Sequence, residues 1–352
     1  MERVIQSRLE RVKKKRFRKR LFRLFLLTVL IIVGTGSFFA AKLFGALSKG
    51  HDDLGKSKWR EAQVEIKKDP FTILLIGSDQ LTSDTEKKES WRPDVLLVAA
   101  INPKTNSMKL VSIPRDTYVE IANTPGHKDK INASAWYGTK NGAGDVKNTI
   151  ETVQNFLHVP IDYYAKVNFK GFMDAVDTLG GVDVNVPFYF STQNHLGQSL
   201  KFNPGPQHLN GEQALAYVRM RKKDPMNDHG RNKRQQEVIA ALLERMLSTQ
   251  GLAKFTEVTE VVGENFSYSF KPSDFPSLLA TYNKVKKNME TIQLKTYGEK
   301  RKSGGRSVWF EICSDSERKR VSRILQQQIE YVPKEDMKQS DAYTSEGKNG
   351  TR

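Results

Sequence analysis

The stretch Arg219–Gln236 combines cations, carboxylates and amides at spacings that suit the binding of phosphate. An arginine presents a planar fork of N–H donors that matches phosphate oxygens two at a time. Several such forks within one stretch suit a doubly charged pyrophosphate. The same composition would also fit a basic, solvated helix face with incidental acidic residues, so the spacing has to decide between the two interpretations.

Two of these arginines, Arg219 and Arg221, are separated by a single residue. This spacing places both side chains on one face of a strand but on opposing sides of a helix, so it predicts an extended segment. The residues before them, 210–217, have the pattern of a short helix with Asn210 at its N-cap. We therefore expect this helix to lead directly into a strand that carries both arginines.

A second helix is predicted over residues 229–249, beginning near Asp228 or Gly230. Arg231 and Gln235 are four residues apart and share one face of this helix. The free backbone amides of a helix N-terminus also bind anions, which adds to the effect of the side chains beside them.

From Phe71 onward, the chain alternates between apolar β-rich segments and helical patterns. Strands are predicted over residues 71–77, 94–101, 108–113, 161–168 and 182–187. Helices are predicted over residues 143–157, 169–179, 210–217, 229–249, 273–288 and 315–332. This mixture predicts an α/β domain of three layers, α/β/α, with a central mixed sheet. We expect the main globular domain to span residues 70–332, after a stalk over 48–69 and before a disordered tail over 333–352.

An antiparallel pairing of the strands at 71–77 and 94–101 would place Asp79 and Asp94 side by side at one edge of the sheet. Carboxylate oxygens suit Mg²⁺, which keeps several water ligands when it serves a phosphorylated substrate. We therefore predict that Asp79 and Asp94 are metal ligands. Each aspartate taken alone would also fit a turn or a cap.

Two arginines reach the same edge of the predicted sheet. The turn signal at 102–106 predicts a hairpin whose second strand, 108–113, runs back and delivers Arg115 to this edge. Arg92 lies just before the preceding strand. The edge would then combine acids and arginines from three loops, although Arg115 would also fit a structural ion pair with Asp116.

The chain has 352 residues and a formal net charge of +17, which invites a nucleic-acid interpretation. Residues 1–23 hold eleven Lys or Arg and two Glu, which gives this tail a net charge of +9 and leaves +8 for the rest. The folded part is therefore only moderately basic, and we expect no nucleic-acid partner.

An uncharged apolar run follows the basic tail from Leu24 to Ala41, and apolar residues continue to Leu47. At ~1.5 Å per residue, a helix over 24–47 is long enough to cross a bilayer core of roughly 30 Å. The positive-inside rule places residues 1–23 in the cytoplasm and the domain outside, as in a single-pass cell-membrane protein. A cleaved signal peptide is the alternative, but its apolar region would be shorter, about 7–15 residues.

Several kinds of chemistry are disfavoured by residue counts and spacing. The single cysteine, Cys313, cannot form an intramolecular disulfide or a cysteine-based metal cluster. The six histidines show no i, i+4 pairing on a helix, which argues against a zinc site. The sequence also contains no glycine-rich phosphate loop and no nucleophile elbow.

Taken together, the motifs resemble those of the LytR-CpsA-Psr family of membrane-anchored cell-wall ligases. The resemblance covers residues 65–250 and rests on the order and spacing of the motifs. They are Leu74–Asp79, Arg92–Asp94, Ser112–Asp116, Lys130–Ala133, Leu179–Val182, Leu209–Leu215 and the arginine-rich stretch Arg219–Gln236.

The resemblance implies an enzyme that moves an anionic glycopolymer, such as wall teichoic acid, from an undecaprenyl-pyrophosphate carrier to a sugar hydroxyl of peptidoglycan. It implies that Mg²⁺, or Mn²⁺ in its place, is bound by Asp79 and Asp94. It assigns the pyrophosphate contacts to Arg92, Arg115, Arg219, Arg221, Arg231 and Gln235. It implies catalytic roles for Arg115, Arg219, Arg221, Asp224 and Asp228. The candidate bases for the acceptor hydroxyl are Asp94, Asp224, Asp228 and His229.

Three other functions are compatible with parts of this pattern. A membrane-anchored transcription attenuator would use the basic tail on DNA, but the predicted topology places the domain on the other side of the membrane. A binding module would hold lipid-linked polymer without turning it over, and a lipid-pyrophosphate hydrolase would use water as the acceptor. Phosphoryl transfer requires charge neutralisation and alignment, which Mg²⁺ and several guanidinium groups supply. The ligase is therefore the favoured interpretation.

Overall fold

The computed structural model describes residues 50–80, 91–221, 223–226, 228–248, 263–303 and 305–333, together with Gly45, Ser48, Gly251, Lys254, Glu257, Val258 and Val261. The predicted tail over 1–23 lies outside the described residues, and so does the predicted span over 24–47 apart from Gly45. Within the described part, no helix combines the length and the apolar character that a bilayer span requires. The predicted C-terminal tail also lies outside it, except for Pro333.

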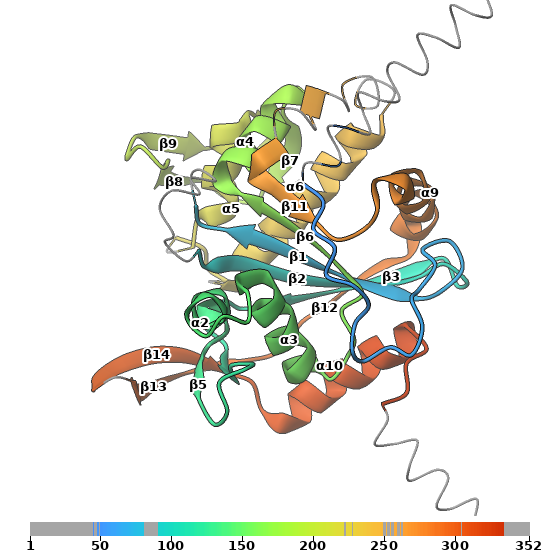
Figure 1. The fold of residues 1–352 in the computed structure, drawn as a ribbon. Helices are drawn as coiled ribbons and strands as arrows, with labels where there is room; N and C mark the ends of the chain where they lie inside the picture. Colours follow the sequence, from blue (N-terminus) through green and yellow to red (C-terminus); the bar gives the residue numbers. More distant parts are fainter. Residues whose placement is uncertain are drawn as a thin grey trace, which may run out of the picture.

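A six-stranded mixed sheet forms the centre of the domain (Figure 1). Its order is β11 (Phe266–Tyr268), β6 (Tyr163–Asn168), β1 (Phe71–Ser78), β2 (Pro93–Asn102), β3 (Ser107–Ile113) and β12 (Met289–Ile292). Strand β2 pairs antiparallel with both β1 and β3, which confirms the predicted pairing and the predicted hairpin. Strands β6 and β12 add parallel to β1 and β3, and β11 closes the sheet antiparallel to β6.

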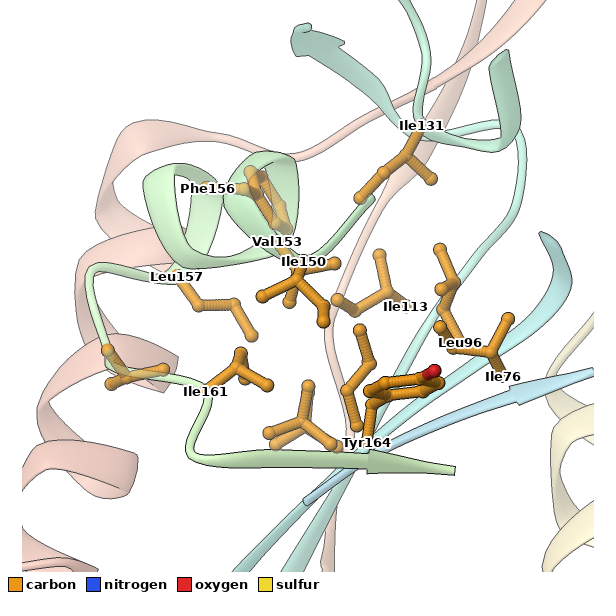
Figure 2. Packing of buried hydrophobic residues seen from close by; sticks show 14 of the residues in the cluster. Ile76, Leu96, Ile113, Ile131, Ile150, Val153, Phe156, Leu157, Ile161 and Tyr164 are labelled. Atoms are coloured by element: carbon orange, nitrogen blue, oxygen red, sulfur yellow. The ribbon is translucent and has the colours of Figure 1, made fainter. Parts of the chain in front are cut away.

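Three helices cover the first face of the sheet (Figure 1): α2 (Ser134–Lys140), α3 (Asp145–Leu157) and α10 (Asp315–Gln328). Figure 2 shows Ile150 and Leu157 of α3 in one cluster with sheet residues such as Ile76. These side chains are buried, and burying one of this size stabilises the fold by roughly 1.5–3 kcal/mol. The packed face holds β1, β2 and β3 as a rigid platform.

The second face carries α4 (Phe169–Thr178), α6 (Asp228–Leu247) and α9 (Phe275–Val285). Helix α5 (Gly211–Arg219) packs on α4 and α6 rather than on the sheet. A second apolar cluster joins these helices, with Tyr217 of α5 and Val238 of α6 fully buried in it. Helices α4, α5 and α6 therefore share a core of their own. Val285 of α9 and Ile239 of α6 pack with strand residues such as Leu97 in a third cluster.

Among the described residues, four two-stranded ribbons lie around the sheet. They are β4 (Tyr118–Glu120) with β5 (Lys128–Lys130), β7 (Val182–Val186) with β10 (Gly205–Leu209), β8 (Phe190–Gln193) with β9 (Ser199–Phe202), and β13 (Tyr297–Ser303) with β14 (Arg306–Ile312). Short 3₁₀ turns complete the described elements: η1 (Ile131–Ala133), η2 (Gly263–Asn265), η3 (Pro272–Asp274) and η4 (Lys286–Asn288).

The structure differs from the sequence predictions at the periphery of the sheet. The predicted strand at 182–187 exists as β7, but it pairs with β10 instead of joining the central sheet. The predicted helix at 273–288 is divided into η3, α9 and η4, and the edge strands β11 and β12 were not predicted. Edge strands of three or four residues are too short to show a periodic pattern.

The segment predicted as a stalk, 48–69, lies against the domain over its described residues. Arg60 forms an ion pair with Asp162, with 3.0 Å between Nε and Oδ1, and Asp162 also accepts from the backbone N–H of Thr72 in β1. Ile66 is buried at 5% exposure and Tyr164 donates to Asp52. These contacts make the segment part of the body of the domain.

Candidate active site

A cavity of about 1420 Å³ lies between the second face of the sheet and helices α4, α6 and α9. Successive side chains of β1 point to opposite faces of the sheet. Leu74 therefore packs in the first core, whereas Ile73 and Leu75 line the cavity. Its apolar lining includes Phe71, Ile73, Leu75, Leu97, Ala99, Met108, Phe172, Ile239, Leu278 and Tyr282. Pockets for small ligands usually measure about 300–1,000 Å³, so this one suits a longer apolar group.

The cavity follows the strands for most of their length. Lining residues include Gly77, which pairs with Val95 at one end of the β1–β2 ladder, and Phe71, which pairs with Ile101 at the other. Six residues of strand correspond to roughly 20 Å. One end of the cavity therefore lies at the edge where the sequence predicts the acids and arginines.

Cations and amides line the same cavity as the apolar residues. They are Arg115, Arg219, Arg221, Lys223, Arg231, Asn168, Gln193, Gln235 and Gln236, with Asp94 as the acidic member. An apolar chamber with several guanidinium groups suits an anion that carries a long apolar chain.

Asp94 and Arg115 form the first ion pair of this site. Asp94 is the second residue of β2, beside the bulge between Gly77 and Ser78, and Arg115 follows the end of β3. The Nη1 atom of Arg115 donates to Oδ1 and Oδ2 of Asp94 at 2.9 and 2.8 Å. The predicted convergence of these two residues on one edge is therefore confirmed.

Asp116 is the centre of a second cluster beside this pair. It is 8% exposed, and its Oδ1 accepts from Nζ of Lys130 at 2.6 Å. Its Oδ2 lies 3.9 Å from Nε of Arg115 and 3.9 Å from Nη1 of Arg221. This carboxylate links the loop after β3 to the arginine-rich stretch, a contact between distant segments that the sequence alone did not indicate.

Asp79, which follows the end of β1, and Arg92, which precedes the start of β2, lie next to each other. The backbone N–H of Arg92 donates to Oδ1 of Asp79 at 3.1 Å, and the backbone N–H of Asp79 donates to the Arg92 carbonyl at 3.3 Å. Both residues are exposed, and neither lines the cavity. Pro93 pairs with Ser78, so Asp79 and Asp94 leave neighbouring strands at the same edge.

Trp91 anchors the segment that carries Arg92 and Asp94. Its indole N–H donates to Asp145 of α3, and the ammonium group of Lys166 lies 4.4 Å from the centre of its ring. Burial lowers the pKa of Lys166, and Asp145 partly offsets that effect. The anchor fixes the start of β2, and with it the position of the Asp94 backbone.

The donor set at this edge fits Mg²⁺ in part. Asp79 and Asp94 supply carboxylate oxygens, the ligands that Mg²⁺ prefers, and a Mg²⁺ ion that serves a phosphorylated substrate completes its shell with phosphate oxygens and water. Among the described residues, no group of three or more His, Cys, Asp or Glu side chains gathers as a metal cluster. Two carboxylates are enough only if the substrate provides the remaining ligands.

The segment from Arg219 to Arg221 differs from the predicted strand. Asn210 forms a capping box with Gln213, which confirms the predicted N-cap, and α5 continues through Arg219. Met220, the residue after the helix, is extended, with φ −60° and ψ 130°. The prediction of a strand was wrong because the helix extends two residues further than the sequence pattern indicated. Both arginines nevertheless line the cavity.

Arg219 is an exposed residue whose guanidinium lies over an aromatic ring. The Cζ atom of Arg219 is 4.6 Å from the ring centre of Phe169, the first residue of α4. This stacking orients the guanidinium without using its N–H donors, which leaves the donor edge available for phosphate.

Helix α6 begins at Asp228, as predicted, and contributes Arg231 and Gln235 to the cavity. Both residues are mostly buried, at 7% and 9% exposure, and their spacing of four places them on one face. Nε2 of Gln235 also lies 3.5 Å from the carbonyl oxygen of Val218 in α5. The side chains of Asp228 and His229 lie outside the described part of the structure.

Asp224 occupies a buried ion pair instead of the cavity wall. Its Oδ2 accepts from Nη1 of Arg234, its Oδ1 accepts from the backbone N–H of Met226 at 2.7 Å, and both charged side chains are 3% exposed or less. Arg234 also donates to the carbonyl groups of Tyr217 and Met220. The pair ties the end of α5 to α6.

Lys223 is a cavity-lining cation that the sequence did not single out. Its Nζ donates to Oγ of Ser191 in β8 at 2.7 Å, which connects the arginine-rich stretch to the β8–β9 ribbon. The signal was available, since Lys223 belongs to the same basic stretch, but the sequence did not distinguish it from the solvated lysines around it.

Residues 37–326 match the LytR_cpsA_psr family. The chain is 37% identical over 322 residues to the polyisoprenyl-teichoic acid–peptidoglycan teichoic acid transferase TagV of Bacillus subtilis, covering 90% of this chain and 80% of TagV. It is 37% identical over 293 residues to the transferase TagU of Bacillus subtilis, covering 82% and 90% of the two chains.

The fold is similar to that of solved structures. The crystal structure of Bacillus subtilis TagV superposes with a TM-score of 0.64 at 36% identity, covering 76% of this chain and 100% of that one. The structure of TagT bound to LI-WTA superposes with a TM-score of 0.62 at 29% identity, covering 79% and 99%. The match to the family extends over most of the sequence and includes every motif described above, so this chain belongs to the LytR-CpsA-Psr family.

Proposed function

We propose that this protein transfers an anionic, teichoic-acid-type polymer from a polyisoprenyl-pyrophosphate carrier, here undecaprenyl, to a sugar hydroxyl of peptidoglycan. The reaction forms a phosphodiester to the sugar and releases the lipid phosphate. The observation that carries this proposal is the long apolar cavity, which ends at a sheet edge with Asp94, Arg115 and neighbouring cations. Relatives at 37% identity are named as polyisoprenyl-teichoic acid–peptidoglycan teichoic acid transferases, which agrees with this chemistry.

The isoprenoid chain of the donor would occupy the apolar part of the cavity. Its walls come from aliphatic and aromatic side chains of the sheet, α4, α6 and α9, which offer few hydrogen bonds to a polar ligand. Removing a long hydrocarbon chain from water supplies non-directional binding energy of about 25 cal/mol per Å². The bound isoprenoid chain would thereby hold the pyrophosphate at the cationic end of the cavity.

The guanidinium groups would bind the pyrophosphate and stabilise the charge that develops in transfer. Arg231 and Gln235 are buried in the wall, Arg219 is oriented by Phe169, and Arg221 is close to Asp116. In-line phosphoryl transfer depends on such positioning and charge neutralisation rather than on a covalent nucleophile. Arg115 would contact the phosphate beside Asp94, and exposed Arg92 would contact it from outside the cavity.

Mg²⁺, or Mn²⁺ in its place, would be held by Asp79 and Asp94 and would neutralise phosphate charge. The acceptor hydroxyl would lose its proton to a carboxylate or to His229. Asp94 is one candidate because it lines the cavity, although it would have to release its contact with Arg115, and Asp228 and His229 are the candidates at the start of α6. We assign Asp224 a supporting role, because its carboxylate is buried in the contacts with Arg234 and Met226 and does not line the cavity.

The proposed site of action is the cell envelope. A single transmembrane anchor over residues 24–47, with a cytoplasmic basic tail, would hold the domain at the outer surface of the membrane, where both the lipid carrier and peptidoglycan are accessible. The domain would then load its donor directly from the bilayer.

The full-length protein in detergent, given a polyprenyl-pyrophosphate-linked donor, Mg²⁺ and peptidoglycan oligomers, tests the proposal. We expect a phosphodiester-linked product by mass spectrometry. Arg219→Ala should reduce its rate of formation by about 10–100-fold, the value of one charge-assisted contact, without changing the melting temperature. Lys233→Ala serves as the control, because Lys233 is an exposed cation of α6 that does not line the cavity.

The products separate the alternative functions. Released phosphosugar without transfer to the glycan would identify a hydrolase. Bound and unreacted donor would identify a binding module. Equal loss of activity in the Arg219 and Lys233 variants would show that Arg219 has no specific role in the site.

A further inference from the structure

The β13–β14 hairpin projects from the body of the domain, on the side of the molecule where β8 and β9 also project (Figure 1). Its base is attached to the candidate active site. The backbone N–H of Glu311 in β14 donates to the carbonyl of Asp116 at 2.9 Å, and Glu311 forms a parallel bridge with Thr117. Asp116 is the carboxylate that lies beside Arg115 and Arg221.

One face of this hairpin packs on the domain. The ring of Phe310 meets that of Tyr118 edge-on, with 4.9 Å between the centroids, and the guanidinium of Arg301 lies 4.6 Å from the same ring centre. Because side chains alternate along a strand, the residues next to them in sequence occupy the opposite face. That face carries Lys300 and Lys302 on β13, opposite Trp309 and Ser307 on β14, and Gly298 opposite Glu311. The carboxylate of Glu311 accepts from the hydroxyl of Thr296 at 2.8 Å.

The outward face presents a flat aromatic surface. The indole of Trp309 lies directly over Gly298, since a Cβ atom at that glycine would be only 1.7 Å from Cζ2 of the ring. The absence of a side chain at residue 298 therefore allows the ring to lie against the backbone. Trp309 stays 45% exposed, and Lys300 and Lys302 beside it are exposed as well.

We propose that this face, made of Gly298, Lys300, Lys302 and Trp309, binds the acceptor glycan. The apolar C–H face of a sugar ring stacks on the indole, and the two ammonium groups pair with carboxylates carried by the glycan. A tryptophan whose ring lies on a glycine keeps one broad apolar face exposed, and tryptophan is enriched at interfaces because it combines such a face with a polar N–H group.

The position of the face matches an acceptor site. Trp309 lies two residues from Glu311, roughly 7 Å along the strand from the contact with Asp116. A glycan held on the indole would therefore have its neighbouring sugars beside the arginines of the cavity end. This inference rests on the proposed transfer and adds the surface that brings the acceptor hydroxyl to the phosphate.

The chemistry favours the glycan acceptor over the anionic donor polymer. Cations alone would bind a chain of phosphates, and the cavity end already supplies several. A flat indole adds affinity only for a ring that stacks, whereas the lysines add affinity for carboxylates. A glycan strand with acidic substituents provides both groups.

Calorimetric titration of the full-length protein in detergent with soluble, carboxylate-bearing peptidoglycan oligomers tests the surface. Trp309→Ala should raise the dissociation constant by roughly tenfold, as for an aromatic anchor. Gly298→Ala should have a similar effect, because its methyl group displaces the ring. The double variant should lose no more glycan affinity than either single variant, because both changes remove the same stacked ring. In the transfer reaction, KM for the glycan should rise while kcat and KM for the lipid donor stay unchanged.

Two further variants keep the test decisive. Lys300→Gln with Lys302→Gln should weaken glycan binding and reduce its salt dependence without affecting folding. Trp136→Ala removes another exposed tryptophan, on α2, and should leave binding unchanged. Unchanged glycan affinity in the Trp309 and Gly298 variants, or weakened binding of the donor polymer instead, would overturn the assignment. A wild-type chain that binds glycan on this face but transfers nothing would refute the proposed function and leave the surface intact.

Discussion

Burial divides the charged residues of the arginine-rich stretch into two groups with different tasks. Arg234 and Asp224 are sealed between α5 and α6, and all their contacts serve the fold. Arg219 is exposed, and its guanidinium is held by an aromatic ring instead of a carboxylate. The residue types are the same, so a substitution at each position should affect a different property of the protein.

Asp224→Asn should act on stability first. The change leaves Arg234 as a buried charge without its carboxylate, and breaking a buried pair in this way costs about 3–5 kcal/mol. We expect a large fall in the melting temperature, with loss of transfer that follows the loss of folded protein. Gly230→Ala is a second route to the same effect, since a Cβ atom there would be 1.9 Å from the Asp224 carboxylate. An Asp224→Asn protein of normal stability that fails to transfer would instead make Asp224 catalytic.

The sequence predicted some of these residues better than others. Asp94 and Arg115 could be brought together from strand order alone, because an antiparallel β1–β2–β3 arrangement determines which strand ends meet. The central position of Asp116 could not be predicted. It depends on Lys130 and Arg221, whose approach is set by the packing of segments far apart in the chain.

The helices and strands also divide into those that local sequence predicts and those that depend on contacts with distant segments. Strands β1, β2 and β3 and helices α3, α5 and α6 follow from periodicity and capping, which are local. The sequence predicted the end of α5 two residues too early, because contacts from another helix stabilise its last turn. Arg234 of α6 donates to the Tyr217 and Met220 carbonyls there. The same reason applies to β11 and β12, which are strands only because the sheet edge pairs with them.

Helix α10 offers a pH-dependent test at the level of an element. The side chain of Arg320, and then the backbone N–H of Lys295, donate to Glu317 and lower its pKa to about 2, from 4.5. A carboxyl group with a depressed pKa stabilises the fold above its unfolded pKa and loses that contribution as the pH falls. The stabilising effect should therefore be complete near pH 6 and decline between about pH 4.5 and 2.

Glu317→Gln should lower the free energy of unfolding at neutral pH by about 1–2 kcal/mol, after allowance for the partly exposed Arg320. It should also flatten the dependence of stability on pH in the acidic range. Chemical denaturation at several pH values measures both effects. Glu65→Gln is the matched control, because Glu65 and Lys68 form an ion pair with more than 60% of each side chain exposed. Parallel pH profiles for the wild-type and Glu317→Gln proteins would contradict the assignment.

At the scale of the whole molecule, one sheet serves two purposes through the two faces of its strands. The first face is sealed by α2, α3 and α10 and supplies a rigid core. On the second face, α4, α5 and α6 share a core of their own, α9 packs on the strands through Val285, and the cavity lies between these helices and the sheet. Composition and periodicity predict that both faces are apolar. They do not predict that a cavity remains on one face, because its size depends on how closely the helices of that face pack on the strands.

If a polyisoprenyl chain fills that space, then narrowing it should discriminate between donors by chain length. Ala99 is 5% exposed on β2, pairs with Ile73 and Leu110, and lines the cavity midway along the sheet. Ala99→Phe should raise KM for a long-chain donor by roughly tenfold and change KM little for a donor of two or three isoprene units. Ala280→Phe adds the same ring at an exposed position of α9 that does not line the cavity, and should alter neither value. An unchanged KM for the long-chain donor, at unchanged melting temperature, would mean that the lipid does not extend past Ala99 and that the cavity serves another ligand.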